Sequence, residues 1–114
     1  MAFELKKEQV GGVLVLSVEG ELVLGPQLRH SSSNVKNLGG VTGIVVDLTE
    51  CRRVDSAGMG ELLMWYSIAA KAQQRLLLAG ASEAVRVMMR TARVDSILLH
   101  AVDKAAAIDE LSRG

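Results

Sequence analysis

The stretch from Asp55 to Gly60, with the sequence Asp-Ser-Ala-Gly-Met-Gly, holds the residues whose types and spacing could do chemistry. The pattern around it predicts a strand at 43–48, a polar connection at 49–55 and a long helix from about Ser56 to Gln74. Either Asp55 or Ser56 could cap the free N–H groups where that helix begins. We therefore expect an accessible hydroxyl at a helix N-terminus, a place that favours nearby negative charge.

Two glycines fall in the first turn of this predicted helix, at Gly58 and Gly60. Glycine costs about 1 kcal/mol relative to alanine inside a helix. A sequence that accepts two of them indicates that another group approaches this backbone closely.

The elements that position this stretch alternate between strands and helices. Glycines at 11–12 predict a hairpin between strands at 3–10 and 13–18, and Pro26 opens a helix that the serines at 31–33 weaken. Further strands are predicted at 75–79 and 97–101, and further helices after Ser82 and Asp103. Single helices between strands imply parallel pairing. We predict one α/β domain over 1–114, with a mixed sheet of about five strands, an N-terminal β-hairpin and then βα units whose helices pack on the sheet.

Composition narrows the classes of function. The 114 residues are 49% hydrophobic and 23% charged, with a formal net charge of zero, so no long-range field attracts nucleic acid or an anionic membrane. We expect that the start of the chain is not a secretory signal, and no stretch approaches the roughly 18 apolar residues of a membrane span. Cys51 is the single cysteine, which excludes an internal disulfide and a cysteine metal cage. We expect a cytoplasmic protein without a cofactor.

The Asp-Ser-Ala-Gly-Met-Gly stretch resembles the Asp-Ser-x-Gly-x-Gly signature of STAS domains, in the branch of bacterial anti-sigma-factor antagonists. Gly20-Glu21-Leu22 resembles the Gly-Glu-Leu that follows the second strand in this family, and Asp47-Leu48 resembles its strand-end Asp-Leu. The resemblance covers nearly the whole chain and implies a STAS fold.

The resemblance also implies a function and a site. In such antagonists the serine of the motif, here Ser56, is phosphorylated by an anti-sigma factor that is also a serine kinase. The unphosphorylated antagonist captures that partner and frees the sigma factor, and a PP2C-type phosphatase resets the phosphorylated form. The partner-binding residues implied are Asp55, Ser56, Ala57, Gly58, Met59, Gly60, Val23 and Asp47. From the residues alone, Asp47 could equally be a strand-end carboxylate that caps nearby N–H groups.

One position departs from the family pattern. Antagonists usually carry an acidic residue directly after Gly-Glu-Leu, near the phosphorylation site, and this chain has Val23. The departure favours an alternative function, a structural STAS module in a stress-signalling scaffold or transporter-associated complex without kinase control. Neither function is enzymatic.

The long helix carries more apolar surface than one stripe needs. Its spacing predicts that Met59, Leu62, Leu63, Tyr66 and Ala70 face the sheet, which places Met64, Trp65 and Ile68 on the opposite side. A second apolar face of this kind is typical of a surface that binds a partner or a second copy of the chain. Alternatively, a neighbouring helix or the end of the chain covers it.

A hydrolase that pairs Ser56 with His30 or His100 is a further hypothesis, but nothing in the sequence places a histidine near the serine. The two histidines have no partner at ligand spacing, so we expect no metal site.

Overall fold

The chain begins with an antiparallel hairpin of β1 (Phe3–Val10) and β2 (Val13–Leu22), as seen in a computed structural model that describes residues 2–113. Gly11 has a φ of 58° in the turn, a conformation that glycine adopts without steric cost. The hairpin predicted from the paired glycines is therefore confirmed.

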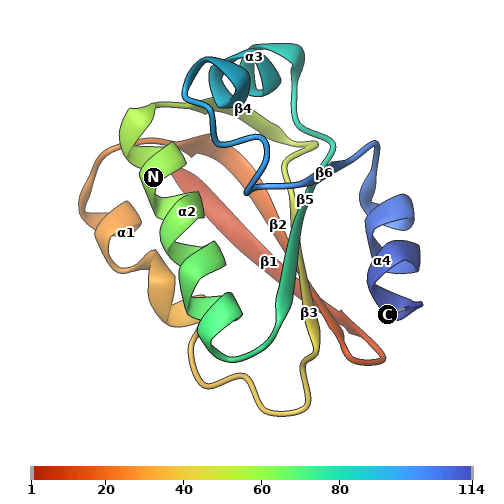
Figure 1. The fold of residues 1–114 in the computed structure, drawn as a ribbon. Coiled ribbons are helices and arrows are strands. Elements are labelled where there is room, and N and C mark those ends of the chain that lie inside the picture. The colour runs from red at the N-terminus through yellow and green to blue at the C-terminus, as the bar shows by residue number, and fades with distance from the viewer. Residues whose placement is uncertain (1, 114) are drawn as a thin grey trace.

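Parallel strands continue the sheet from β2. Within residues 2–113 the sheet has six strands, in the order β1-β2-β3-β5-β6 with β4 paired to β2 (Figure 1). The added strands are β3 (Gly43–Asp47), β4 (Cys51–Val54), β5 (Arg75–Ala79) and β6 (His100–Ala101), all parallel to their neighbours. This arrangement confirms the predicted α/β class with a mixed sheet.

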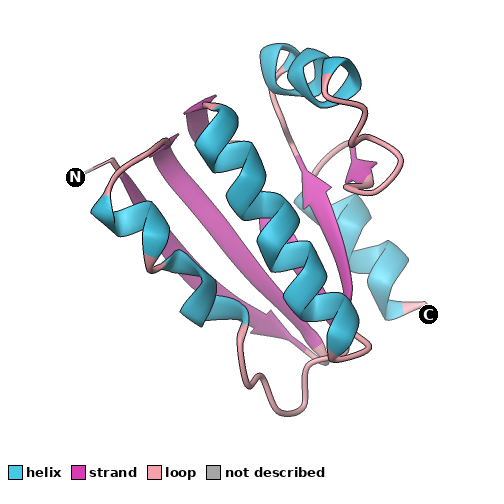
Figure 2. Ribbon diagram, turned by 60° about the vertical axis from the view of Figure 1, so that its left-hand side comes forward, coloured by secondary structure: helices cyan, strands magenta, loops and turns pink. Residues whose placement is uncertain are grey.

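Helical segments cover both faces of the sheet. They are α1 (Pro26–Arg29), the 3-10 segment η1 (Ser31–Val35), α2 (Ser56–Lys71), α3 (Glu83–Thr91) and α4 (Lys104–Ser112). In Figure 2, α1, η1 and α2 lie side by side over one face, while α4 lies behind the sheet. The sheet is thus the middle layer of the molecule.

Alternating side chains of the central strands build two apolar cores. Leu16, Ile44 and Leu78 belong to the larger cluster, which includes the buried side chains of α2. Val15 and Val45 point the other way, into a smaller cluster with Leu111 of α4. Because successive side chains of a strand point to opposite faces, a strand that is apolar throughout must be covered on both sides.

Strand β4 corrects the prediction of a polar connection at 49–55. Its two arginines are exposed, but Cys51 and Val54 at its ends are buried. The strand forms because β2 extends past the end of β3: β3 pairs with β2 only as far as Ser17, which leaves 20–22 free to pair with β4.

The helix expected after Pro26 is broken, with α1 ending at Arg29 and η1 following it. The serine hydroxyls explain the break, since Ser31 donates to the Leu28 carbonyl at 2.7 Å and Ser33 donates to the His30 carbonyl at 3.1 Å. Side chains that bond nearby carbonyls compete with continued helix formation.

The last strand is shorter than the predicted 97–101. The amides of Ile97 and Leu98 both donate to the Val94 carbonyl, which forms a turn there. Only His100 and Ala101 pair with β5.

Trp65 corrects the predicted orientation of α2. Its side chain is completely buried, whereas Met64 is 51% exposed and Ile68 is half-buried. The indole N–H donates to Glu61 Oε1 at 3.2 Å, and the Ser31 hydroxyl of η1 donates to the same oxygen at 3.1 Å. Trp65 is therefore covered by a neighbouring helical segment, η1, and is not part of an open interface, whereas Met64 on the same side of α2 stays exposed.

Candidate functional site

Asp55 joins the start of α2 to the connection that follows β2. It is the N-cap residue of α2, and its Oδ1 accepts a hydrogen bond from the Gly58 N–H at 2.8 Å. Its Oδ2 accepts from the Leu24 N–H at 3.0 Å, and its own N–H donates to the Leu22 carbonyl at 3.3 Å. One side chain thus satisfies donors from two segments that are far apart in sequence.

These bonds hold the pKa of Asp55 below its ordinary value. The Leu24 N–H is the largest cause, the Gly58 N–H adds to it, and partial burial opposes both. The positive charge of Arg53 also lowers this pKa. The carboxylate is therefore ionised at neutral pH and adds a fixed negative charge beside Ser56.

Ser56 is the first residue of α2, and its side chain is exposed. Because Asp55 provides the cap, the Ser56 hydroxyl is not needed for that purpose. An exposed hydroxyl at a helix N-terminus is open to modification by another protein, and the helix dipole tolerates added negative charge there.

The two glycines of the motif have different physical roles. A Cβ on Gly58 would lie 2.0 Å from the Leu22 carbonyl oxygen, so only glycine fits where α2 crosses the end of β2. A Cβ on Gly60 would meet nothing within 4 Å. The close approach inferred from the sequence is therefore internal at Gly58, while Gly60 leaves an open surface one turn from Ser56.

Leu24 is a site residue that the sequence analysis missed. Its side chain is 69% exposed, and its amide is bound by the Asp55 carboxylate. Leucine beside Gly25-Pro26 suggests a turn, but no local pattern indicates contact with a residue 31 positions away. Only the pairing of β2 with β4 brings the two segments together.

The structure does not gather all of the expected partner-binding residues at one surface. Val23 and Ala57 are half-buried beside Asp55 and Ser56 in sequence, and Gly60 is exposed. Gly58 and Met59 are buried, so the prediction that they present contacts to a partner is corrected: α2 turns both toward the core.

Asp47 is engaged by Thr49 rather than by the residues of the motif. Its Oδ1 accepts from the Thr49 amide at 3.2 Å and from the Thr49 hydroxyl at 2.6 Å. It lines a polar hollow with Ser17 and Lys104, on the side of the sheet where α4 begins. These bonds favour the interpretation of Asp47 as a capping carboxylate at the end of β3.

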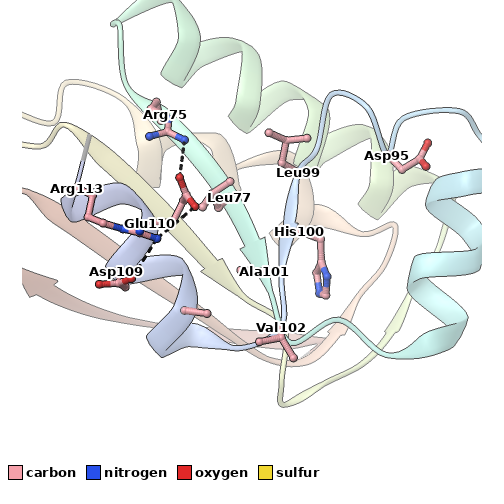
Figure 3. Close-up of a pocket in the computed structure, with 11 residues that line it drawn as sticks. Arg75, Leu77, Asp95, Leu99, His100, Ala101, Val102, Asp109, Glu110 and Arg113 are labelled. Carbon is pink, nitrogen blue, oxygen red and sulfur yellow. Dashed lines mark ion pairs between the residues drawn. The ribbon is translucent and has the colours of Figure 1, made fainter.

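A hollow of about 740 Å³ lies at the β5–β6 edge of the sheet beside α4, lined by both apolar and charged groups (Figure 3). Arg75 pairs with Glu110 at 3.7 Å, and Arg113 pairs with Asp109 at 3.2 Å. These ion pairs satisfy charges at its rim, and none of the residues from 55 to 60 lines it.

The histidines are engaged elsewhere. His100 Nε2 accepts a hydrogen bond from the Ala81 N–H at 3.0 Å, and burial together with the nearby charge of Arg86 lowers its pKa. His30 is exposed at the junction of α1 and η1. The described part of the chain contains no hydrogen bond between Ser56 and either histidine.

Neither a metal-binding cluster nor a membrane-crossing helix is found among the described residues. No group of three or more His, Cys, Asp or Glu side chains could hold a metal ion in residues 2–113. None of the helices described is long and apolar enough to cross a membrane.

The sequence profile of the family described as "Mlab, STAS domain" matches residues 5–100, which is most of the chain. The chain belongs to the STAS domain family. The resemblance of the Asp55–Gly60 motif to STAS domains is thereby confirmed. No curated protein matches the sequence significantly.

Solved structures share the STAS fold at low sequence identity. A putative anti-sigma factor antagonist from Thermotoga maritima has a TM-score of 0.85 and 18% identity, over 96% of this chain and 95% of that one. The phosphorylated form of the Bacillus cell fate determinant SpoIIAA has a TM-score of 0.68 and 24% identity, over 96% and 98%. A sulfate transporter family protein from Wolinella succinogenes has a TM-score of 0.74 and 14% identity, over 90% and 86%.

The double role of Asp55 in this STAS domain predicts a measurable loss of stability. We expect Asp55→Ala to lower the free energy of unfolding by about 2 kcal/mol, because the cap of α2 and the bond to Leu24 are both lost. Asp103→Ala is the matched control, since Asp103 caps α4 with one bond of 2.8 Å to the Ala106 N–H, and it should cost about 1 kcal/mol. Urea unfolding measures both, and equal losses would contradict the double role.

The same carboxylate predicts a pH dependence. A lowered pKa in the folded state means that ionised Asp55 contributes stability above its unfolded pKa of about 3.9. That contribution is lost as the pH falls through the folded pKa, because folding then requires release of a proton. Asp55→Asn should therefore show a weaker loss of stability below about pH 4 than the parent chain.

Proposed function

We propose that this STAS domain is a protein-binding module that acts as an anti-sigma-factor antagonist and is switched at Ser56. Unphosphorylated, it binds an anti-sigma factor with serine kinase activity, which releases a sigma factor and so regulates transcription. Phosphorylation of Ser56 ends the binding, and a PP2C-type phosphatase restores it. The observation that carries the proposal is the exposed Ser56 hydroxyl at the N-terminus of α2, next to a carboxylate held ionised.

Electrostatics supports such a switch without a change of fold. A phosphate adds roughly −1.5 to −2 charges and three acceptor oxygens. The N-terminus of α2 tolerates this charge, but a partner that covers Ser56 would have to desolvate the phosphate beside ionised Asp55. A loss of about 3 kcal/mol in binding free energy weakens affinity more than a hundredfold.

The comparisons support the proposal by analogy of fold. The similar Thermotoga maritima protein is described as a putative anti-sigma factor antagonist, and the similar Bacillus protein is described in a phosphorylated form. We assign the partner surface to Ser56, Asp55, Ala57, Gly60 and Val23, with no catalytic role for any of them. A cytoplasmic location follows from this role.

A second function is favoured by one residue of the chain. Val23 is apolar and half-buried where antagonists usually carry an acidic residue, and the similar Wolinella succinogenes structure comes from a sulfate transporter family protein. These observations favour a STAS module in a stress-signalling scaffold or transporter-associated complex without kinase control. In that case association, including any homodimer, would not depend on the state of Ser56.

The decisive experiment measures affinity for the serine-kinase anti-sigma factors of the source organism, each purified, by titration calorimetry. We expect binding by the parent chain and by Ser56→Ala, and at least a hundredfold weaker binding by Ser56→Asp. Incubation with the kinase and ATP should add one phosphate, mapped to Ser56 by mass spectrometry, only in chains that retain the serine.

Equal affinity of the parent chain and Ser56→Asp would reject the switch and favour the scaffold function. Labelling of Ser56 by a fluorophosphonate probe would instead support the hydrolase hypothesis, and we expect none.

A further inference from the structure

A second, smaller hollow of about 150 Å³ is lined by α3, β6 and the connection between them. Its lining residues are Arg86, Met89, Arg90, Asp95, Leu98 and His100. Met89 and Leu98 are buried, so the hollow has an apolar base under a charged rim. Pockets for drug-sized ligands usually have volumes of about 300 to 1,000 Å³. This hollow therefore suits a small ion, and none of the residues from 55 to 60 lines it.

Two arginines of the hollow have no counter-ion. Arg86 and Arg90 are four residues apart on α3, so they lie on the same side of the helix. Within residues 2–113, neither of them takes part in an ion pair. Glu83 stands three residues before Arg86 on the same helix, but it pairs with neither arginine. The two guanidinium groups therefore offer positive charge and N–H donors to a ligand.

His100 contributes a neutral ring with a further donor. Its Nε2 accepts the Ala81 N–H at 3.0 Å, so the neutral ring carries its proton on Nδ1. Burial of the ring and the charge of Arg86 lower the pKa of His100, which keeps the ring neutral at pH 7. Among the described side chains, the buried atoms without a hydrogen-bond partner do not include this Nδ1. The histidine therefore adds an N–H group and no negative charge to the wall of the hollow.

Asp95 supplies the one carboxylate among the described residues that line the hollow. Its side chain is exposed, and it forms no ion pair with a described residue. Arg93 is also exposed on this connection but does not line the hollow. Two arginines against one aspartate leave the lining with a net positive charge, which favours an anion.

We propose that this hollow is a binding site for a small oxyanion of the phosphate type, which the guanidinium groups of Arg86 and Arg90 hold beside the ring of His100. Arginine is always charged, and its planar group can bond two phosphate oxygens at once. The bound ion would connect α3 with β6, which has only two residues and is the shortest strand of the described sheet. A free phosphate ion and a small phosphate monoester present the same oxygens, so the site recognises what they share.

Nuclear magnetic resonance of the histidine rings tests this site in the parent chain. Inorganic phosphate is added at neutral pH, and sodium chloride of equal ionic strength is added to a second sample. We expect the ring signals of His100 to shift and to saturate at millimolar phosphate, but not to respond to chloride. Signals of His30 should stay unchanged, because His30 is exposed at the junction of α1 and η1 and does not line the hollow.

Four variants assign the effect to the lining side chains. We expect Arg86→Gln and Arg90→Gln each to weaken phosphate binding about tenfold, since each removes charge and a pair of donors. Arg29→Gln is the matched control, because Arg29 is an exposed helical arginine that does not line this hollow, and it should bind phosphate like the parent chain. Asp95→Asn should bind phosphate about threefold more tightly, because the opposing carboxylate is removed. Damage to the fold cannot produce such a gain.

Two further ligands define the chemistry that the site accepts. Methyl phosphate should shift the same His100 signals if the site takes monoesters, and a response to inorganic phosphate alone identifies the free ion as the ligand. Acetate should bind more weakly than phosphate, since it carries less charge and fewer oxygens. Acetate binding as tight as that of phosphate overturns the assignment to phosphate. Equal phosphate affinity of the parent chain and both arginine variants, or no saturable shift at His100, overturns the site itself.

Discussion

Gly58→Ala is expected to lower the free energy of unfolding by at least about 3 kcal/mol. The new Cβ would lie 2.0 Å from the Leu22 carbonyl oxygen and 2.9 Å from the Leu22 carbonyl carbon, both of them backbone atoms. This backbone has little freedom to move, since the Leu22 side chain is fully buried and its carbonyl accepts the Asp55 N–H. The gain of about 1 kcal/mol in helix propensity cannot offset such an overlap.

Gly60→Ala is the matched control for this prediction. The substitution is chemically the same and falls in the same helix, but its Cβ meets nothing within 4 Å. We expect Gly60→Ala to stabilise the chain by about 0.5 to 1 kcal/mol, as alanine does in a helix interior. Urea unfolding followed by the fluorescence of Trp65, the single tryptophan of the chain, measures both variants. Equal stability of the two variants would show that α2 does not cross the end of β2 as described.

Trp65→Ala is expected to lower the free energy of unfolding by about 3 to 5 kcal/mol. A loss of this size is enough to unfold a large fraction of the molecules of a marginally stable domain. The indole is completely buried in the larger core, and its N–H donates to Glu61 Oε1. Truncation leaves a cavity between α2 and its neighbours and removes that hydrogen bond. The sequence pattern alone predicted an outer-face tryptophan, for which the same change would have cost little.

Met64→Ala is the control for Trp65→Ala, since Met64 is the preceding residue and is 51% exposed. Met64→Ala should lower the free energy of unfolding by less than about 1 kcal/mol. Far-ultraviolet circular dichroism in urea follows both variants, because the tryptophan signal is absent from one of them. Similar losses of stability for the two variants would indicate that Trp65 is exposed, and would support the hypothesis that it forms an interface.

Much of the fold was predictable because its determinants are local. The paired glycines at 11–12 specify the hairpin, and continuous apolar runs identify β2, β3 and β5 as central strands. Capping residues mark the helix starts, since Asp55, Ser82 and Asp103 each accept an amide of the first turn. Each of these signals acts between residues within a few positions of one another.

The errors at β4 and α2 arose where a distant segment decided the outcome. Strand β4 forms only because the free end of β2 lies beside it, and the orientation of α2 depends on η1, whose Ser31 shares Glu61 with Trp65. An amphipathic wheel assumes one apolar stripe facing one sheet. It cannot show that a second segment covers the adjacent side of the helix.

For the candidate site, the sequence by itself determined that Asp55 and Ser56 stand at a helix start, where either could cap the helix, because motif and cap are local. Only the tertiary structure decided that the cap also holds Leu24, that Gly58 makes room for Leu22, and that Met59 turns into the core. The physical reason is that these relations join atoms more than thirty residues apart, or depend on which face of an element turns inward. Sheet pairing and core packing determine these contacts and orientations, and the spacing of residues along one segment does not reveal them.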